Sequence, residues 1–318
     1  MLRFGVPRRA PTPNPIIPAK ATDRTGTGPI LRRASAAITK RYAGLLADVR
    51  EAFDRIPVYQ LNLETDAPRV RYGMTPEQLA ALSQELQSAL DRWLTDGRER
   101  GHVVWWEPFL EEAHQLGAAA TAANLTRLST TYAAARSLEM IVFSEPYRVR
   151  LAMAKHQSYE HWTRLAANLR GDLATVIGQA VVDGLNPRAA RKLIEERVGV
   201  HRGRAMGYAQ TDITGALREA RMAEADDAQQ ELGIKVGLLW TSAFLPTTRP
   251  THAARHGKAY TSEQVREFYS RDGNRYRCHC SCTEVLLDDN GRPILNDKAK
   301  KAMAGELAGW RKAHGKRS

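Results

Sequence analysis

All three cysteines of this 318-residue chain lie within five positions, at 278, 280 and 282 of the segment RYRCHCSC (275–282). Thiolate and imidazole groups are the usual ligands of structural zinc, which takes four of them. His252 and His256 are four residues apart, so they would share one face of a helical turn. One interpretation is a zinc site of two histidines and two cysteines: His252, His256, Cys278 and Cys280. Cys282 or His279 could replace one member.

Other interpretations fit the same cysteines. Cysteine is often buried as a small hydrophobic residue, so thiols at alternate positions could line the inner face of a strand, or two of them could form a disulfide. A nucleophilic cysteine would need an oriented base and an oxyanion site. No third group with a recognisable role accompanies Cys278 or Cys280, so we expect no catalytic residue in this segment.

The segment TTRPTHAARHGKAY (247–260) offers a similar choice. In a catalytic interpretation, Arg249 would bind a phosphate and His252 would move a proton. In a structural interpretation, Arg249 would bridge loop carbonyls or a carboxylate such as Asp212 or Glu219. No phosphate-binding glycine loop or carboxylate pair accompanies Arg249, so the structural interpretation is favoured.

Helices dominate the elements that must position these residues. Apolar residues at steps of three and four predict helices over 34–56 and 75–97, and Ala/Leu-rich segments predict long helices over 103–143 and 147–185. Further helices are predicted over 187–198 and 202–233, with Gly233 as the C-terminal cap. The short apolar run 234–240 then reads as a strand. Trp105 and Trp106 at a helix entrance are expected in the core, or alternatively as a partner anchor.

The predicted fold is mainly α, with a long-helix N-terminal region followed by a small α+β C-terminal domain. The first thirty residues hold six of the fifteen prolines, which favours an extended arm that lies on a partner. The predicted parts are a basic Pro-rich arm (1–33), a helical region (34–200), an α+β domain (201–290) and a basic tail (291–318). No apolar run reaches the roughly 18 residues that span a bilayer, so we expect a soluble protein without a membrane partner.

The net charge of +12 belongs to the two ends of the chain. Residues 1–50 carry ten Lys/Arg against two Asp/Glu, and residues 291–318 carry eight against two, so the residues between are close to neutral. Basic ends suit non-specific contact with phosphate backbones or with an acidic protein surface, or they simply aid solubility. The predicted nucleic-acid contacts are the basic residues of the last helix: Lys298, Lys300, Lys301, Arg311 and Lys312. That helix could equally pack on a protein neighbour.

The order of several motifs in residues 184–285 resembles the phage head-morphogenesis family of Mu F-like minor capsid proteins. The family shows a helix with an Arg-x-x-x-x-Ala-x-Thr-acidic pattern, a strand that ends in Trp, a Thr-Arg-Pro-x-His segment with a following Gly, and a late Cys-x-Cys. The matching residues here are Arg204, Ala209, Thr211, Asp212, Trp240, Thr248, Arg249, Pro250, His252, Gly257, Cys278 and Cys280.

The resemblance implies a minor head protein of a tailed bacteriophage that acts by binding. Its partners would be the portal protein, the major capsid protein and the packaged double-stranded DNA, and it would reside in the virion after assembly in the host cytoplasm. Two alternatives remain open. One is a metal-dependent hydrolase or nuclease that uses His252, His256 and the thiols, and the other is a free DNA-binding protein.

Overall fold

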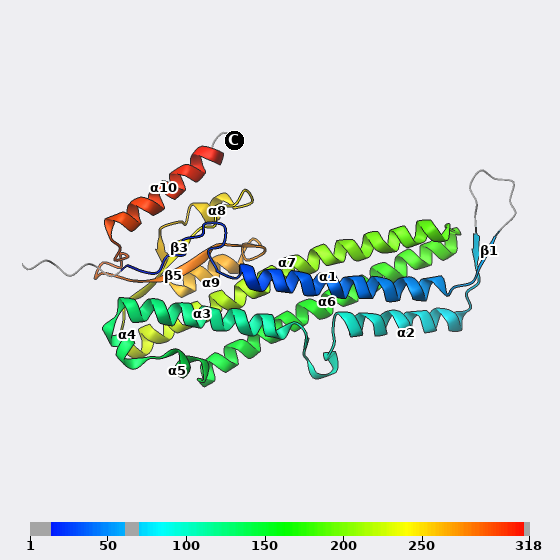
Figure 1. Ribbon diagram of the computed structural model, residues 1–318, viewed down its shortest axis with the longest axis horizontal. Coiled ribbons are helices and arrows are strands. Elements are labelled where there is room, and N and C mark those ends of the chain that lie inside the picture. The colour runs from blue at the N-terminus through cyan, green and yellow to red at the C-terminus, as the bar shows by residue number, and fades with distance from the viewer. Residues whose placement is uncertain (1–13, 61–69, 315–318) are drawn as a thin grey trace, which may run out of the picture. The chain divides into compact units, whose positions relative to one another are not determined.

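The computed structural model describes residues 14–60 and 70–314 of the chain (Figure 1). Its contacts divide the chain into two compact units. We call them the sheet unit (Met1–Gly28, Ala113–Arg150 and Thr214–Ser318) and the helical unit (Pro29–Glu112 and Leu151–Ile213). Residue 200, where the sequence analysis placed a domain boundary, lies inside a continuous helix. Within the described residues, no helix is both long and apolar enough to cross a membrane.

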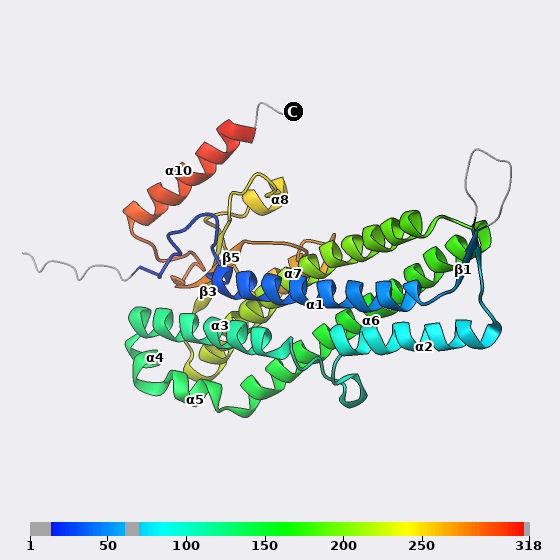
Figure 2. The same ribbon diagram turned by 45° about the vertical axis from the view of Figure 1, so that its right-hand side comes forward.

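Four helices run side by side in the helical unit (Figures 1 and 2). They are α1 (Gly28–Asp54), α2 (Pro76–Trp93), and parts of α6 (Glu145–Asp183) and α7 (Pro187–Leu232). The apolar face of α1 is fully buried, as its spacing predicts, at Ile38, Tyr42, Leu45 and Val49. The Thr75 side chain and Gln78 form a capping box at the start of α2, which confirms the predicted helix start there.

Aromatic packing closes the bundle beside the start of α3 (Glu107–Leu128). Trp106 is 1% exposed and donates from Nε1 to Ser158 Oγ at 2.7 Å. Its ring meets Trp162 at 5.3 Å, and Trp105 meets the same ring at 4.8 Å. The prediction that this tryptophan pair belongs to the core is confirmed for Trp106. Trp105 is half-buried, and the Arg41 guanidinium lies over its ring, 4.4 Å from the ring centre.

Two predicted helix boundaries are wrong. The single helix expected over 103–143 is broken into α3, α4 (Thr130–Ala135) and α5 (Leu138–Val142), because Ser129 and Ser137 act as N-caps that accept backbone N–H groups of the next turn. The two helices expected over 187–198 and 202–233 form one 46-residue helix, α7. The helix continues through the predicted break at residues 199–201. His201 in this stretch is buried, and its Nε2 lies 2.8 Å from Asp172 Oδ2.

The predicted strand 234–240 is confirmed as β3 (Val236–Thr241), the centre of an antiparallel sheet in the order β4-β3-β5. The partners are β4 (Ala259–Tyr260) and β5 (Ser281–Leu286), and β3 pairs with β5 along its whole length from Val236↔Leu286 to Thr241↔Ser281. The sheet unit also holds α8 (Pro250–Ala253), α9 (Ser262–Ser270) and α10 (Asp297–His314). The remaining elements, in the helical unit, are β1 (Val58–Gln60), β2 (Val70–Tyr72) and a 3-10 turn at Arg98–Arg100.

A buried ionic network ties β5 to helices α3 and α7 within the sheet unit. The Glu284 side chain is completely buried and accepts hydrogen bonds from Arg221 Nε at 2.9 Å and Nη2 at 2.7 Å. Thr121 Oγ1 donates to the same carboxylate at 2.9 Å, and Asn124 Nδ2 donates at 3.0 Å. Four donors therefore satisfy one buried carboxylate, as a charge in a protein interior requires.

The predicted end of the N-terminal arm at residue 33 is wrong. Residues 1–13 lie outside the described residues, residues 14–27 form no helix or strand, and residues 28–33 already belong to α1. Arg24, 2% exposed, holds residues 14–27 on the sheet unit. It donates to the carbonyls of Pro18 at 2.5 Å and Ser242 at 3.1 Å, and its Nη2 pairs with Glu306 of α10 at 2.6 Å.

Candidate functional site

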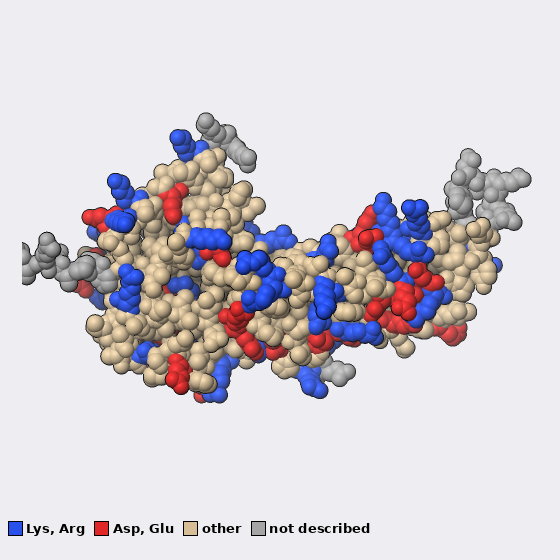
Figure 3. Space-filling model, viewed as in Figure 1, with Lys and Arg blue, Asp and Glu red and all other residues tan. Residues whose placement is uncertain are grey.

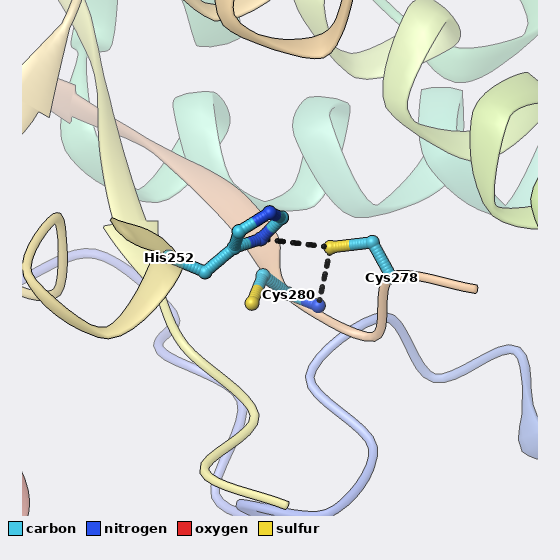
Figure 4. Close-up of side chains that lie close together, drawn as sticks. All are labelled: His252, Cys278 and Cys280. Carbon is cyan, nitrogen blue, oxygen red and sulfur yellow. Dashed lines mark hydrogen bonds between the residues drawn. The ribbon is translucent and has the colours of Figure 1, made fainter. Parts of the chain in front are cut away.

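Three of the four predicted metal ligands come together in the sheet unit. His252, Cys278 and Cys280 place one donor atom each within 4.8 Å of one another (Figure 4). Cys278 Sγ lies 3.4 Å from His252 Nδ1. The three residues are 2%, 4% and 2% exposed, so the cluster lies in the core rather than in an open cleft.

The turn that carries His252 is fixed from both sides. Arg249 is the N-cap residue of α8 and Pro250 occupies its first turn, which is where proline fits a helix. At the end of β3, Ser242 Oγ donates to the His252 carbonyl at 2.8 Å. The ring of His252 lies edge-on to Trp240 of β3 at 5.8 Å. Main chain and ring are therefore both held where Nδ1 faces the thiols.

Asn274 and Arg249 both lie beside the far nitrogen of the His252 ring, Nε2. Asn274 Nδ2 donates to the Phe268 carbonyl at 3.0 Å, so its Oδ1 is the atom that faces His252 Nε2, at 3.3 Å. Arg249 Nη1 lies 3.4 Å from the same nitrogen, and Nδ1 on the other side of the ring faces Cys278 Sγ at 3.4 Å. An imidazole held by an acceptor on its far nitrogen is the usual arrangement of a metal-binding histidine.

Arg249 joins the His252 turn to the loop before the cysteines. Its Nη1 donates to the Asn274 carbonyl at 3.2 Å and its Nη2 to the Tyr276 carbonyl at 3.1 Å. The structural interpretation of Arg249 as a bridge between loop carbonyls is confirmed. The alternative carboxylates have other partners: Glu219 pairs with Arg266 at 2.9 Å, and Asp212 accepts from Ser158 Oγ at 2.7 Å.

A second arginine, Arg218 of α7, supports the cysteine loop from the other direction. It is 4% exposed, and its Nη2 donates to the carbonyls of Cys278 at 2.6 Å and Cys280 at 3.0 Å. Its guanidinium also lies 4.5 Å from the ring centre of Tyr269. A buried cation bonded to neutral carbonyls favours negative charge on any ionisable group beside it.

The two clustered thiols respond to this environment in opposite directions. A hydrogen bond from Cys280 lowers the pKa of Cys278 well below its usual range, and Arg218 and His252 act in the same direction against burial. The same hydrogen bond, together with burial, raises the pKa of Cys280. The surroundings therefore favour the charged form on Cys278 and the neutral form on Cys280.

His256 does not join the cluster, so the prediction that it is the fourth ligand is wrong. Its Nδ1 accepts the Ser242 N–H at 3.0 Å, and its Nε2 lies 3.1 Å from Glu306 Oε2. The four-residue spacing from His252 fails because α8 ends at Ala253 and turns follow over 254–257. Burial lowers the pKa of His256 to about 4, with Arg24 acting in the same direction and Glu306 opposing it.

The remaining cysteine, Cys282, sits on β5 opposite Trp240 and outside the donor cluster. Burial raises its pKa to about 12, as expected for a thiol that packs as a small apolar side chain. His279 is half-buried and also lies outside the cluster. All three cysteines are free thiols, so the disulfide interpretation is wrong.

The other motif residues are not gathered at this cluster. Arg204 is exposed on α7, and Thr211 Oγ1 donates to the Gly207 carbonyl at 2.8 Å. Asp212 accepts from Ser158 Oγ at 2.7 Å and lies 2.9 Å from His161 Nδ1, all within the helical unit. Only Trp240, fully buried, contributes directly to the packing around His252.

The predicted nucleic-acid contacts lie on α10 of the sheet unit. Basic side chains follow this helix, with acidic ones among them (Figure 3). Lys298, Lys300, Lys301, Arg311 and Lys312 are all exposed. Met303 is buried and Trp310 half-buried, so one side of α10 packs on its own unit. The basic side is left available for contact with an anionic partner.

Sequence reasoning missed Asn274 and Arg218, which orient the cluster. Asn274 stands in a loop and no spacing relates it to His252. Arg218 had a signal, because it and Arg221 interrupt an apolar face of α7 that contains Ala216, Leu217 and Ala220. Charged residues on such a face need a buried partner.

The donor atoms of the cluster lie close enough together that they could hold a metal ion. Tetrahedral zinc with nitrogen and sulfur ligands at about 2.0–2.3 Å holds its donor atoms roughly 3.3–3.8 Å apart, so the 3.4 Å separation of Cys278 Sγ and His252 Nδ1 fits. Within the described residues, the group of donors that could hold an ion has three members rather than four. A zinc ion would take its fourth ligand from outside this set.

Residues 171–283 match the family model described as Phage Mu protein F like protein. The matched range includes α7, β3, α8, α9 and the donor cluster, and it confirms the resemblance seen in the sequence. The family is one of phage head morphogenesis. No curated protein and no solved structure shows significant similarity to the chain.

Proposed function

We propose, starting from the place of residues 171–283 in the Phage Mu protein F like family, that the chain is a minor head protein of a tailed bacteriophage. It would bind the portal protein or the major capsid protein during head assembly and stay with the virion. The family match carries this proposal, since it covers the helix that holds the cysteine loop as well as the loop itself.

The action we propose is attachment rather than turnover. A hydrolytic site needs room for substrate and water beside its reacting groups. His252, Cys278 and Cys280 are instead at most 4% exposed and enclosed by Trp240, Phe268 and Tyr269. This burial supports a rigid unit that presents its outer surface to partners.

We further propose that zinc bound by His252, Cys278 and Cys280 stabilises this unit. The ion would link the loop after β3 to the loop before β5. We expect the purified protein to bind zinc with a 1:1 stoichiometry, measured by elemental analysis after dialysis. Cys280→Ser and His252→Gln should lose the metal and melt at lower temperature.

Two matched variants make the zinc test specific. Cys282→Ser and His256→Gln change the same residue types, in the same unit, outside the cluster, so both should keep the metal. Equal zinc contents in Cys280→Ser and Cys282→Ser, or no zinc in the wild-type protein, would show that the cluster is only a pair of buried thiols with a histidine.

Packaged DNA is the second proposed partner, through the basic side of α10. Exposed Lys300 and Lys301 can neutralise phosphates without base recognition, so the affinity for any duplex should fall steeply as salt increases. The presence of Glu306 and Asp297 on the same helix moderates this attraction. Binding to DNA alone, with no association with heads, would instead favour a free DNA-binding protein.

The experiment that tests the function is fractionation of heads from infected cells that produce the tagged protein. We expect the protein in the head fraction, with chemical cross-links to the portal subunit or the major capsid subunit identified by mass spectrometry. Absence from purified heads would refute the proposal. A Cys278→Ser protein that folds and enters heads but lacks a hydrolytic activity of the wild type would instead point to an active site.

A further inference from the structure

A pocket of about 540 Å³ lies beside α9 in the sheet unit. Its lining includes Arg249, Arg255, Tyr260, Glu267, Phe268 and Arg271. Asn274 also lines it, so the pocket lies on the outer side of the residues that hold His252. Its volume is within the range of roughly 300–1,000 Å³ that ligand sites occupy.

The three arginines of the pocket differ in their partners. Arg249 is bonded to two loop carbonyls, and Arg271 pairs with Glu267 one helical turn earlier. Arg255 lies over aromatic rings instead, 3.8 Å from the centre of Phe268 and 4.7 Å from that of Tyr260. Within the described residues it forms no ion pair with a carboxylate. Its charge is therefore the one available to a ligand.

Stacking leaves a guanidinium free to bind an anion at its edge. The Arg255 guanidinium lies over the rings and bonds to the Tyr260 side chain, while its other N–H groups lie in the plane of the guanidinium and can match the two oxygens of a carboxylate. The rings hold the group in place, so little side-chain entropy is lost when an anion binds. The guanidinium of half-buried Arg255 is thus preorganised for binding an anion, unlike a mobile charge on the surface.

We propose that this pocket receives an aspartate or glutamate side chain of a protein partner. Glu267 and Asp272 in the lining would repel a polyanion such as DNA, whereas a single carboxylate can reach Arg255 between them. Arginine and aromatic residues around a pocket are also typical of the centre of protein interfaces. The proposal deepens the proposed function, because it assigns a contact point to an attachment protein.

The test uses the full-length protein and a fluorescein-labelled tetraglutamate peptide, with anisotropy measured at 0.15 M salt. We expect saturable binding that Arg255→Ala weakens about tenfold or more, as for loss of a charge-assisted hydrogen bond. The matched control is Arg292→Ala, an exposed arginine of the same unit outside the pocket. It should change the affinity less than about twofold, as expected for an exposed charge.

A second variant keeps the test valid if Arg255→Ala unfolds the pocket. Gln264→Glu places a carboxylate in the lining, and glutamate can still accept the Thr261 N–H that completes the capping box of α9. We expect an unchanged melting temperature together with weaker peptide binding, because the new carboxylate competes for Arg255.

Two results would overturn the proposal. Equal weakening by Arg255→Ala and Arg292→Ala would show only the general attraction of a basic protein. Loss of binding to a 20-base-pair duplex in the pocket variants, with peptide binding unchanged, would show that the pocket takes phosphate. Both results leave the head-fractionation experiment unaffected, so failure of the pocket and failure of the proposed function can be told apart.

Discussion

Replacing Glu284 by glutamine tests how much the buried network stabilises the sheet unit. The change preserves the size of the side chain but removes its charge and turns one acceptor oxygen into a donor. Arg221, 5% exposed, then has no carboxylate partner, and the donors of Thr121 and Asn124 face an NH₂ group. Breaking a buried ion pair by removing one partner costs about 3–5 kcal/mol.

That cost is large against the roughly 5–15 kcal/mol that stabilise an ordinary domain. We therefore expect amide hydrogen exchange of the β3 and β5 peptides, followed by mass spectrometry, to accelerate by about 100-fold or more in Glu284→Gln, because every 1.4 kcal/mol corresponds to a factor of ten. Exchange in α1 and α2 of the helical unit serves as the internal reference.

The matched control is Asp289→Asn, which removes the same type of charge from the exposed pair with Lys235. The two pairs have nearly equal lengths, 2.7 Å for Arg221–Glu284 and 2.8 Å for Lys235–Asp289. Glu284 is buried and accepts from four donors, whereas Asp289 is exposed and accepts from one, so Asp289→Asn should leave exchange unchanged. The reasoning is refuted if Glu284→Gln accelerates exchange no more than Asp289→Asn does.

Two further predictions concern stability. Burial lowers the pKa of His114 to about 4, so the unfolded chain binds a proton below pH 6.5 that the folded protein resists. The free energy of unfolding should fall by up to about 3 kcal/mol between pH 6.5 and pH 4, and His114→Phe should remove this part of the dependence in urea titrations; an unchanged slope would contradict the assignment. Gly117→Ala places a Cβ 2.4 Å from the Leu217 carbonyl oxygen and should cost about 1–3 kcal/mol. Gly215→Ala, with open space around its Cβ, should be neutral or stabilising, so equal urea midpoints for the two variants would exclude a close contact of α3 with α7.

Local chemistry explains what the sequence could predict. Thr75 followed by Pro76 predicts a helix start, and a short apolar run after Gly233 predicts β3. The proximity of His252 to the Cys-x-Cys segment was also anticipated from ligand chemistry. In each of these cases, residue types and their spacing carry the information directly.

The failures have physical causes that lie outside local patterns. His256 was assigned to the cluster on helical spacing, but α8 is a single turn, so that spacing no longer sets the direction of the side chain. Ser129 and Ser137 look like ordinary helix residues until their side chains are seen to cap the next segment. Asn274 depends on a contact with His252 in a separate turn 22 positions earlier, which one sequence does not reveal.

The bond between Arg24 and Glu306 also bears on the order in which the chain acquires its structure during synthesis. Arg24 leaves the ribosome well before the carboxylate that neutralises it, which lies 282 positions later. Until α10 has emerged, the segment that contains Arg24 lacks the carboxylate partner for its charge, so it is among the last to settle. A truncated product that lacks α10 should therefore be recognisable by the early cleavage of its N-terminal segment by proteases.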